Sequence, residues 1–207
     1  MTGGKPIASG DVEWEEWSDV PRFAIRYRPL TLAACGPDYQ VGVAIEELRP
    51  GMQSSPAHYH IHEEEHVYVL EGTVTVRIGA DSYGADDYHV GVRIESPEPG
   101  KRLCPMHYHL LEEEQALVLE GQVRLLLGDQ QYEMTAGDYI CFPAGQQVAH
   151  SFMNSGDGPC AYLMIGSHNP NDVCVYPDSN KVAVKALHSH GTGILDLSGV
   201  RGYWDGE

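Results

Sequence analysis

Positively charged residues are scarce in this chain. Thirteen Lys and Arg stand against 30 Asp and Glu, which gives a formal net charge of −17 at pH 7. Nucleic acid and anionic membrane surfaces are bound by patches of positive charge, so the composition argues against both as partners. No apolar run approaches the roughly 20 residues of a membrane-spanning helix. With 42% hydrophobic residues, the sequence predicts a globular protein instead.

Paired cysteines and a secretory leader are also missing from the pattern. The chain has five cysteines, an odd number, and no Cys-x-x-Cys. Its first residues, MTGGKPIASGDVEWEEW, are acidic and lack the basic and apolar regions of a secretory signal. These features favour free thiols and a cytoplasmic location.

Sustained helical periodicity is the third absence. The most helix-like piece, DVEWEEW (11–17), is too short to predict a helix. Glycine and proline, 23 and 13 residues, divide the chain into short segments in which apolar and polar residues alternate. In TVTVRIG (73–79), for example, Val74, Val76 and Ile78 share one face. Such segments are typical of half-buried strands and predict an all-β sandwich or barrel.

A duplicated segment dominates the organisation of the chain. Residues 39–79 align without a gap to residues 88–128, with 21 identities in 41 positions. HYHIHEEEHVYVLEG in the first copy becomes HYHLLEEEQALVLEG in the second. The second copy continues into a further segment that the first copy lacks. We therefore divide the chain into an N-terminal segment (1–38), an incomplete first repeat (39–87), a complete unit (88–168) and a C-terminal extension (169–207).

The second copy contains the residues for a metal site. His107 and His109 lie one residue apart, so a strand would place them on the same face, roughly 6–7 Å apart. Glu114 can join them if the chain turns after His109, and His150 follows a predicted turn at FPAGQQ (142–147). Three neutral imidazoles and one carboxylate suit one divalent transition metal, which we expect to be Mn, Fe, Ni, Zn or Cu. Such an ion would keep coordination positions open for a small molecule.

Each piece of this pattern has a simpler explanation when taken alone. A His-x-His pair in a strand is most often solvated or hydrogen-bonded, and an acidic triplet such as Glu112–Glu114 usually faces water. The combination favours a metal, because the spacing occurs twice and the second copy is followed by a glycine-bounded strand and turn that lead to His150.

The same residues resemble the two signature motifs of the cupin superfamily. The resemblance covers residues 88–166 and, for the first motif only, residues 39–79. It implies a jelly-roll β-barrel preceded by a half-repeat, in effect an incomplete bicupin, and by position it implies the four metal ligands named above. Two spacings depart from the usual motifs, one before each histidine-containing segment. The matching pattern is His107-x-His109-x4-Glu114-x6-Gly121, then Gly137-x5-Pro143-x-Gly145…His150-x3-Asn154.

The first copy offers a second, weaker candidate site. His58, His60 and Glu65 repeat the ligand triad, but no counterpart of His150 follows them. His62, His66 or His89 are alternatives for the fourth position, as are tyrosine and water. The triad is equally consistent with a relic of duplication.

Half a barrel would also leave strand edges and an apolar face uncovered, which proteins avoid. The missing part could come from RFAIRYRPL (22–30), from the strand-like pieces after residue 169, or from a second chain. Of these alternatives we favour a second chain, and hence a homodimer.

These observations favour a metalloenzyme that acts on a small polar or anionic metabolite. The resemblance implies dioxygenase, decarboxylase or isomerase-like chemistry at a centre of three histidines and one glutamate. The alternative is a non-catalytic cupin that binds or senses a sugar or another metabolite. No general acid or base outside the ligands is predicted.

Overall fold

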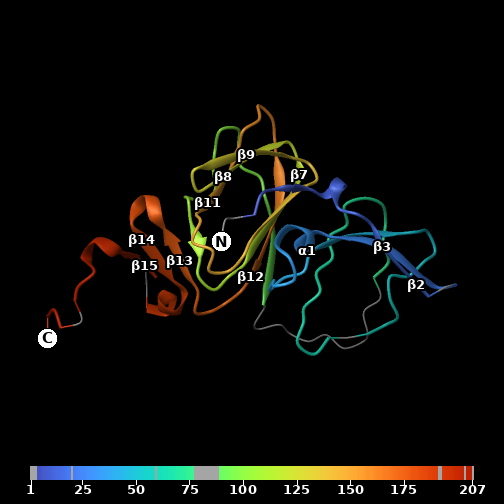
Figure 1. Cartoon of the computed structure of the whole chain (residues 1–207), viewed down its shortest axis with the longest axis horizontal. Coiled ribbons are helices and arrows are strands. Elements are labelled where there is room, and N and C mark those ends of the chain that lie inside the picture. The colour runs from blue at the N-terminus through green and yellow to red at the C-terminus, as the bar shows by residue number, and fades with distance from the viewer. Residues whose placement is uncertain are drawn as a thin grey trace.

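The structure, a computed structural model, describes residues 4–19, 21–58, 60–76, 89–190, 193–202 and 204–206 (Figure 1). Strands are the main regular elements of the described part, as predicted. In chain order they are β1 (Ile7–Ala8), β2 (Glu15–Asp19), β3 (Phe23–Pro29), β4 (Ala44–Leu48), β5 (Val90–Glu95), β6 (Tyr108–His109), β7 (Glu114–Glu120), β8 (Gln122–Leu127), β9 (Gln130–Thr135), β10 (Asp138–Phe142), β11 (His150–Asn154), β12 (Ala161–Ser167), β13 (Val173–Tyr176), β14 (Lys181–Val184) and β15 (Ile194–Asp196).

Helices are short in the described residues, and none is long and apolar enough to cross a membrane. The single α-helix among them, α1, has six residues. The helical elements are η1 (Ser9–Asp11), α1 (Leu30–Cys35), η2 (Pro177–Ser179), η3 (Lys185–His190) and η4 (Leu197–Gly199).

Two sheets form the barrel, and all their strands except β1 come from the second copy and its continuation. One sheet has the order β1-β10-β7-β12-β5 and the other the order β11-β8-β9. Alternate residues of β7, including Ala116 and Val118, face inward and pack against Val123 and Leu125 of β8. These four side chains are at most 1% exposed. The period-2 pattern read from the sequence therefore builds a two-sheet core.

The outer face of the five-stranded sheet is covered by the preceding chain. Leu117 of β7 and Leu163 of β12 point outward and pack with Leu30 of α1 and Val41. Val41 belongs to the beginning of the first copy. The beginning of the first copy therefore covers part of the barrel of the second copy.

The first strand of the first copy finds a partner in the N-terminal segment. β4 pairs with β3, and β3 pairs with β2, which gives a separate three-stranded sheet. Of the alternatives predicted to cover the half-repeat, RFAIRYRPL (22–30) is one that pairs with it. The helix-like piece DVEWEEW instead enters β2, where Trp17 pairs with Ile25.

The predicted strand at TVTVRIG is wrong for the residues that the structure describes. Residues 73–76 form no strand, and residues 77–79 lie outside the described ranges. Val74 and Val76 are 44% and 63% exposed. In the second copy the aligned strand β8 lies between β11 and β9, both of which come after residue 129. The first copy lacks those partners, so its alternating pattern cannot be buried.

The C-terminal extension completes the second copy rather than the first. Its strands form a sheet of order β15-β14-β13-β6, in which β13 pairs with the histidine-bearing β6. The pieces after residue 169 therefore do not cover the half-repeat. In Figure 1 this sheet lies on the opposite side of the barrel from β2 and β3.

The two copies hold each other through equivalent glutamates. The Glu113 carboxylate accepts hydrogen bonds from the backbone N–H groups of Gln40 and Val41, at 3.3 and 3.0 Å. The aligned Glu64 accepts from His89 and Val90, the aligned backbone positions, at 2.9 and 3.0 Å. These backbone hydrogen bonds lower the pKa of Glu64 to about 2. The contact is reciprocal within one chain, and association with a second chain stays a prediction.

Candidate metal centre

Backbone pairing brings the two motifs of the second copy together. His107 and His150 form an antiparallel bridge in which each N–H donates to the carbonyl of the other residue, at 3.1 and 2.8 Å. His109 ends β6, and its carbonyl accepts from Gly145 at the turn before His150, at 3.1 Å. Glu114 opens β7, after the turn that the sequence analysis required between it and His109.

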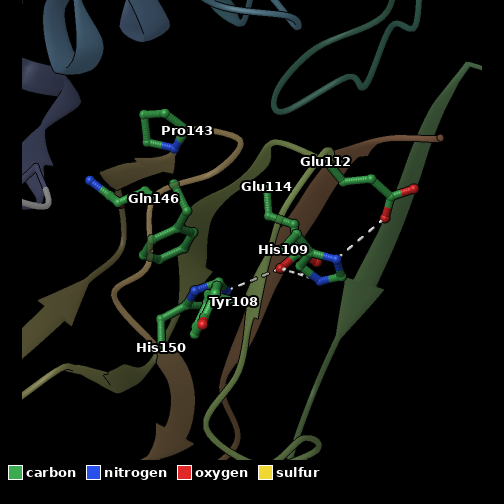
Figure 2. Close-up of a pocket in the computed structure, with 8 residues that line it drawn as sticks. Tyr108, His109, Glu112, Glu114, Pro143, Gln146 and His150 are labelled. Atoms are coloured by element: carbon green, nitrogen blue, oxygen red, sulfur yellow. Dashed lines mark hydrogen bonds and ion pairs between the residues drawn. The ribbon is translucent and has the colours of Figure 1, made fainter. Parts of the chain in front are cut away.

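The four predicted residues converge on one carboxylate oxygen. The Nε2 atoms of His150, His107 and His109 lie 3.0, 3.3 and 3.4 Å from Oε2 of Glu114. All four side chains are largely buried, with exposed fractions between 2% and 13%. Figure 2 shows His109 and His150 on either side of Glu114. Three imidazole nitrogens and one carboxylate at this spacing fit a single transition-metal ion.

Each ring is fixed by a different contact. Nδ1 of His107 lies 2.9 Å from the Pro105 carbonyl, which can only accept, so Nδ1 carries the hydrogen. Nδ1 of His109 lies 2.6 Å from the Asp172 carboxylate. His150 stacks on Phe142 with ring centroids 3.7 Å apart, and its Nδ1 is buried without a hydrogen-bond partner among the described residues.

In the metal-free protein, His107, His109 and Glu114 form a compact cluster of opposite charges. Burial lowers the pKa of His107 and His109, but their hydrogen bonds, including those to Glu114, outweigh burial and raise the two pKa values to about 10 and about 12. Burial raises the pKa of Glu114, and the three histidines more than reverse this, so its pKa lies well below the usual value. Burial lowers the pKa of His150. A bound cation would take the place of the protons on His107 and His109.

The first copy keeps the triad but not its surroundings. Nε2 of His58 and Nε2 of His60 each lie 3.7 Å from Oε2 of Glu65. The three side chains are 33% to 67% exposed. Two of the proposed fourth ligands, His66 and His89, contact Glu64 instead.

The acidic triplet of the second copy is not a solvated loop. Glu112 and Glu113 are only 6% and 1% exposed. Glu113 accepts hydrogen bonds from the backbone of the first copy, as described above, and Glu114 faces the histidines. Glu112 forms an ion pair with Lys185 and lies 3.5 Å from Nδ1 of His109. Each glutamate therefore has different partners, which three identical residues in a row do not indicate.

Asp172 and Lys185 were missed by the sequence analysis. Asp172 stands in the Asn-Pro-Asn-Asp turn at 169–172, where an aspartate is expected for turn chemistry alone. The only available signal was that β13 follows this turn directly. Pairing of β13 with β6 is what delivers Asp172 to His109, and this pairing is not visible in the sequence.

A cavity of about 410 Å³ adjoins the centre. It shares Glu112 and Glu114 with the metal centre and extends along the inner side of β5 and β12. Arg93 and Lys185 bring positive charge to its wall. The lining residues are Gly91, Val92, Arg93, Glu112, Glu114, Met164, Gly166, Ser167, His168 and Lys185.

Comparison with known proteins gives a consistent picture of the family. A family model described as "Cupin domain" matches residues 44–90 and 93–166. A putative sugar phosphate isomerase from Acidithiobacillus ferrooxidans is 31% identical, with a TM-score of 0.49, and the match covers 56% of this chain and 72% of that one. A sugar phosphate isomerase from a cupin superfamily, from Silicibacter pomeroyi, is 27% identical, with a TM-score of 0.50 and coverage of 58% and 76%. A search among curated proteins found no match.

Proposed function

This chain belongs to the cupin family, and on that premise we propose that it is a metal-dependent enzyme acting on a small polar or anionic metabolite. The observation that carries the proposal is the convergence of His107, His109 and His150 on the Glu114 carboxylate, next to a cavity large enough for such a metabolite. The cupin fold alone supports no particular reaction.

The residues around the centre have separate roles in this proposal. His107, His109, Glu114 and His150 would hold one divalent ion, Mn, Fe, Ni, Zn or Cu. When bound, that ion supplies Lewis acidity to an oxygen of the metabolite. Phe142 fixes the plane of His150 and keeps water from one side of the ring.

Two cations support an anionic metabolite. The guanidinium of Arg93 bonds Glu95, and the ammonium of Lys185 bonds Glu112, at the wall of the cavity. Both groups have further N–H donors for a carboxylate or phosphate. The name of the similar protein from Silicibacter pomeroyi supports isomerisation of a sugar phosphate among the candidate reactions, ahead of decarboxylation or oxygen chemistry.

Metal analysis tests the first half of the proposal. Protein purified without an affinity tag and supplied in turn with each of the five metals should retain about one equivalent of at least one of them. The double substitution His107→Ala and His109→Ala should remove that equivalent. The aligned control, His58→Ala and His60→Ala, should keep it. Less than a tenth of an equivalent under all conditions would contradict a metal centre.

A turnover experiment separates an enzyme from a binding protein. The metal-loaded protein is incubated with a large molar excess of a mixture of sugar phosphates and small carboxylates. The mixture is followed by liquid chromatography coupled to mass spectrometry, which also separates isomers of equal mass. Conversion of many molecules per protein is expected for the enzyme. Retention of at most one molecule per protein, with no conversion, would favour the sensing cupin instead.

A further inference from the structure

The C-terminal extension places one carboxylate directly behind the metal centre. Asp172 immediately precedes β13, whose Cys174 pairs with His109 of β6. The side chain of Asp172 is completely buried. It lies beyond the segments matched by the family model, which end at residue 166. Its presence in the centre is therefore a property of this chain's extension, and not of the matched barrel.

The two oxygens of Asp172 bind different partners. Oδ2 lies 2.6 Å from Nδ1 of His109. Oδ1 accepts from the backbone N–H groups of Leu111 and Glu112, at 2.9 and 3.3 Å. The two backbone bonds fix the carboxylate plane, so the oxygen that meets His109 cannot turn away without leaving buried donors unpaired.

We propose that Asp172 is a positioning residue that sets the tautomer and orientation of His109 for metal binding. A carboxylate can only accept a hydrogen bond, so the hydrogen of the neutral imidazole is kept on Nδ1. Nε2, which faces Glu114 at 3.4 Å, is then left with the lone pair that a metal needs. This inference rests on the proposed metal centre and adds a residue that the cupin motifs do not contain.

The first copy provides an internal contrast. Its first histidine is held in the same way as in the second copy, because Nδ1 of His58 lies 2.8 Å from the Pro56 carbonyl. Nδ1 of its second histidine, His60, lies 3.0 Å from the Glu63 carboxylate, and the Glu63 side chain is 75% exposed. The motif alone therefore supplies a carbonyl for the first ring but a solvated carboxylate for the second. In the second copy the aligned Glu112 lies 3.5 Å from Nδ1 of His109, and Asp172 adds a closer, fully buried carboxylate at 2.6 Å.

The substitution Asp172→Asn tests the proposal with almost no change in shape. If the asparagine Oδ1 keeps the bonds to Leu111 and Glu112, its NH₂ group faces Nδ1 of His109 and donates to it. The hydrogen of the imidazole must then move to Nε2, where it blocks the metal. We expect metal affinity, measured by competition with a chromophoric chelator for Zn²⁺ or Co²⁺, to fall by about 10–100-fold. The d–d absorption of bound Co²⁺ should change as well.

A matched control separates this effect from loss of charge. Asp178→Asn makes the same change on an exposed residue of the same extension and should bind Zn²⁺ like the wild type. Circular dichroism of both variants reports whether the fold is kept. Equal affinity of folded Asp172→Asn and wild-type protein would overturn the proposal. If the wild type binds no Zn²⁺, no Co²⁺ and none of the other candidate metals at His109, the proposed metal centre has failed, and not only this inference.

A measurement on the wild type keeps the proposal testable if the variant does not fold. Long-range ¹H–¹⁵N correlation spectra of the Zn²⁺-loaded protein distinguish the two ring nitrogens of His109. We expect a hydrogen-bonded Nδ1–H and a metal-bound Nε2. A metal-bound Nδ1, or a hydrogen on Nε2, would refute the role assigned to Asp172.

Discussion

The two copies share 21 of 41 residues, and yet the histidine motif lies in a buried centre in the second copy and is exposed in the first. Local geometry is almost the same in both. The paired histidine rings are 5.0 Å apart at 79° in the first copy and 5.2 Å apart at 82° in the second. A proline carbonyl holds the first ring in each copy. The short motif therefore preforms a pair of ligands without needing a barrel.

Apart from Glu114, the residues that complete the centre come from parts of the chain outside the repeat. His150 comes from β11, Phe142 from β10 and Asp172 from the C-terminal extension. The first copy has no equivalent segments after residue 79. The short motif therefore sets the geometry of the two histidine ligands. Burial, the fourth ligand and the orientation of the rings come from distant parts of the fold.

The largest expected effect is obtained by making the second site resemble the first. His150→Ala leaves three ligands, as in the first copy. We expect Zn²⁺ affinity to fall by more than the ~10–100-fold that outer-sphere partners contribute. Replacing His58 and His60 with alanine should leave the affinity of the main site unchanged. Similar losses in both variants, measured by chelator competition, would show that the copies are not as different as their burial suggests.

The second prediction concerns protons. In the metal-free protein the pKa values of His107 and His109 are raised to about 10 and about 12, so at pH 7 both rings are protonated. Metal binding should then release up to two protons, and affinity should rise with pH by up to about 100-fold per unit until pH nears 10. Calorimetry in two buffers of different ionisation enthalpy measures the number released.

The same pKa shifts also affect stability. The pKa values of His107 and His109 in the folded protein exceed the unfolded value of about 6.5. Protonation of the two rings therefore stabilises the metal-free fold, and this stabilisation is complete below about pH 6.5. This stabilisation is lost as the pH rises through 10 and 12.

The control for proton release on metal binding is the variant lacking His58 and His60, which should release as many protons as the wild type. Metal binding without proton release would contradict the compact cluster of opposite charges.

A matched pair of glycines gives the third test. Gly121 and the aligned Gly72 both have positive φ, 77° and 83°. A Cβ at Gly121 would lie 2.5 Å from the Pro159 carbonyl oxygen, whereas a Cβ at Gly72 would have no described atom within 4 Å. Gly121→Ala should cost about 2–5 kcal/mol of unfolding free energy, from left-handed strain and overpacking. Gly72→Ala should cost about 1–2 kcal/mol at most. Equal shifts in urea midpoints would mean that both turns are equally packed.

The smallest expected effect comes from a pair of valines. Val123 is fully buried in β8, and the aligned Val74 is 44% exposed. Val123→Ala removes buried methyl groups and should cost about 2 kcal/mol. Val74→Ala should stay within about 0.5 kcal/mol. Denaturation of the two variants under the same conditions compares them. A large loss for Val74→Ala would reveal that the first copy is covered in solution, as in the homodimer that the sequence analysis favours.

The sequence predicted the second copy well because its signals are local. Alternation gave the strands of the barrel core, and the spacing of the two motifs identified the four residues that converge. The first copy was predicted less well. TVTVRIG has the right period for a strand, but period alone does not say whether a partner strand exists. Glu112 and Glu113 were misjudged because charge in a loop normally means exposure, and their buried partners, Lys185 and the backbone of residues 40 and 41, lie far away in the sequence.

The reciprocal glutamate contact has a consequence for the origin of the chain. Glu113 binds residues 40 and 41, and Glu64 binds residues 89 and 90, which are the same positions one repeat later. An isologous interface has this property, since residue i of one subunit meets residue j of the other and the reverse also holds. The two copies are thus arranged at this contact as the subunits of a two-fold dimer would be after fusion into one polypeptide. That internal interface has been kept even though one of the fused units has no complete barrel.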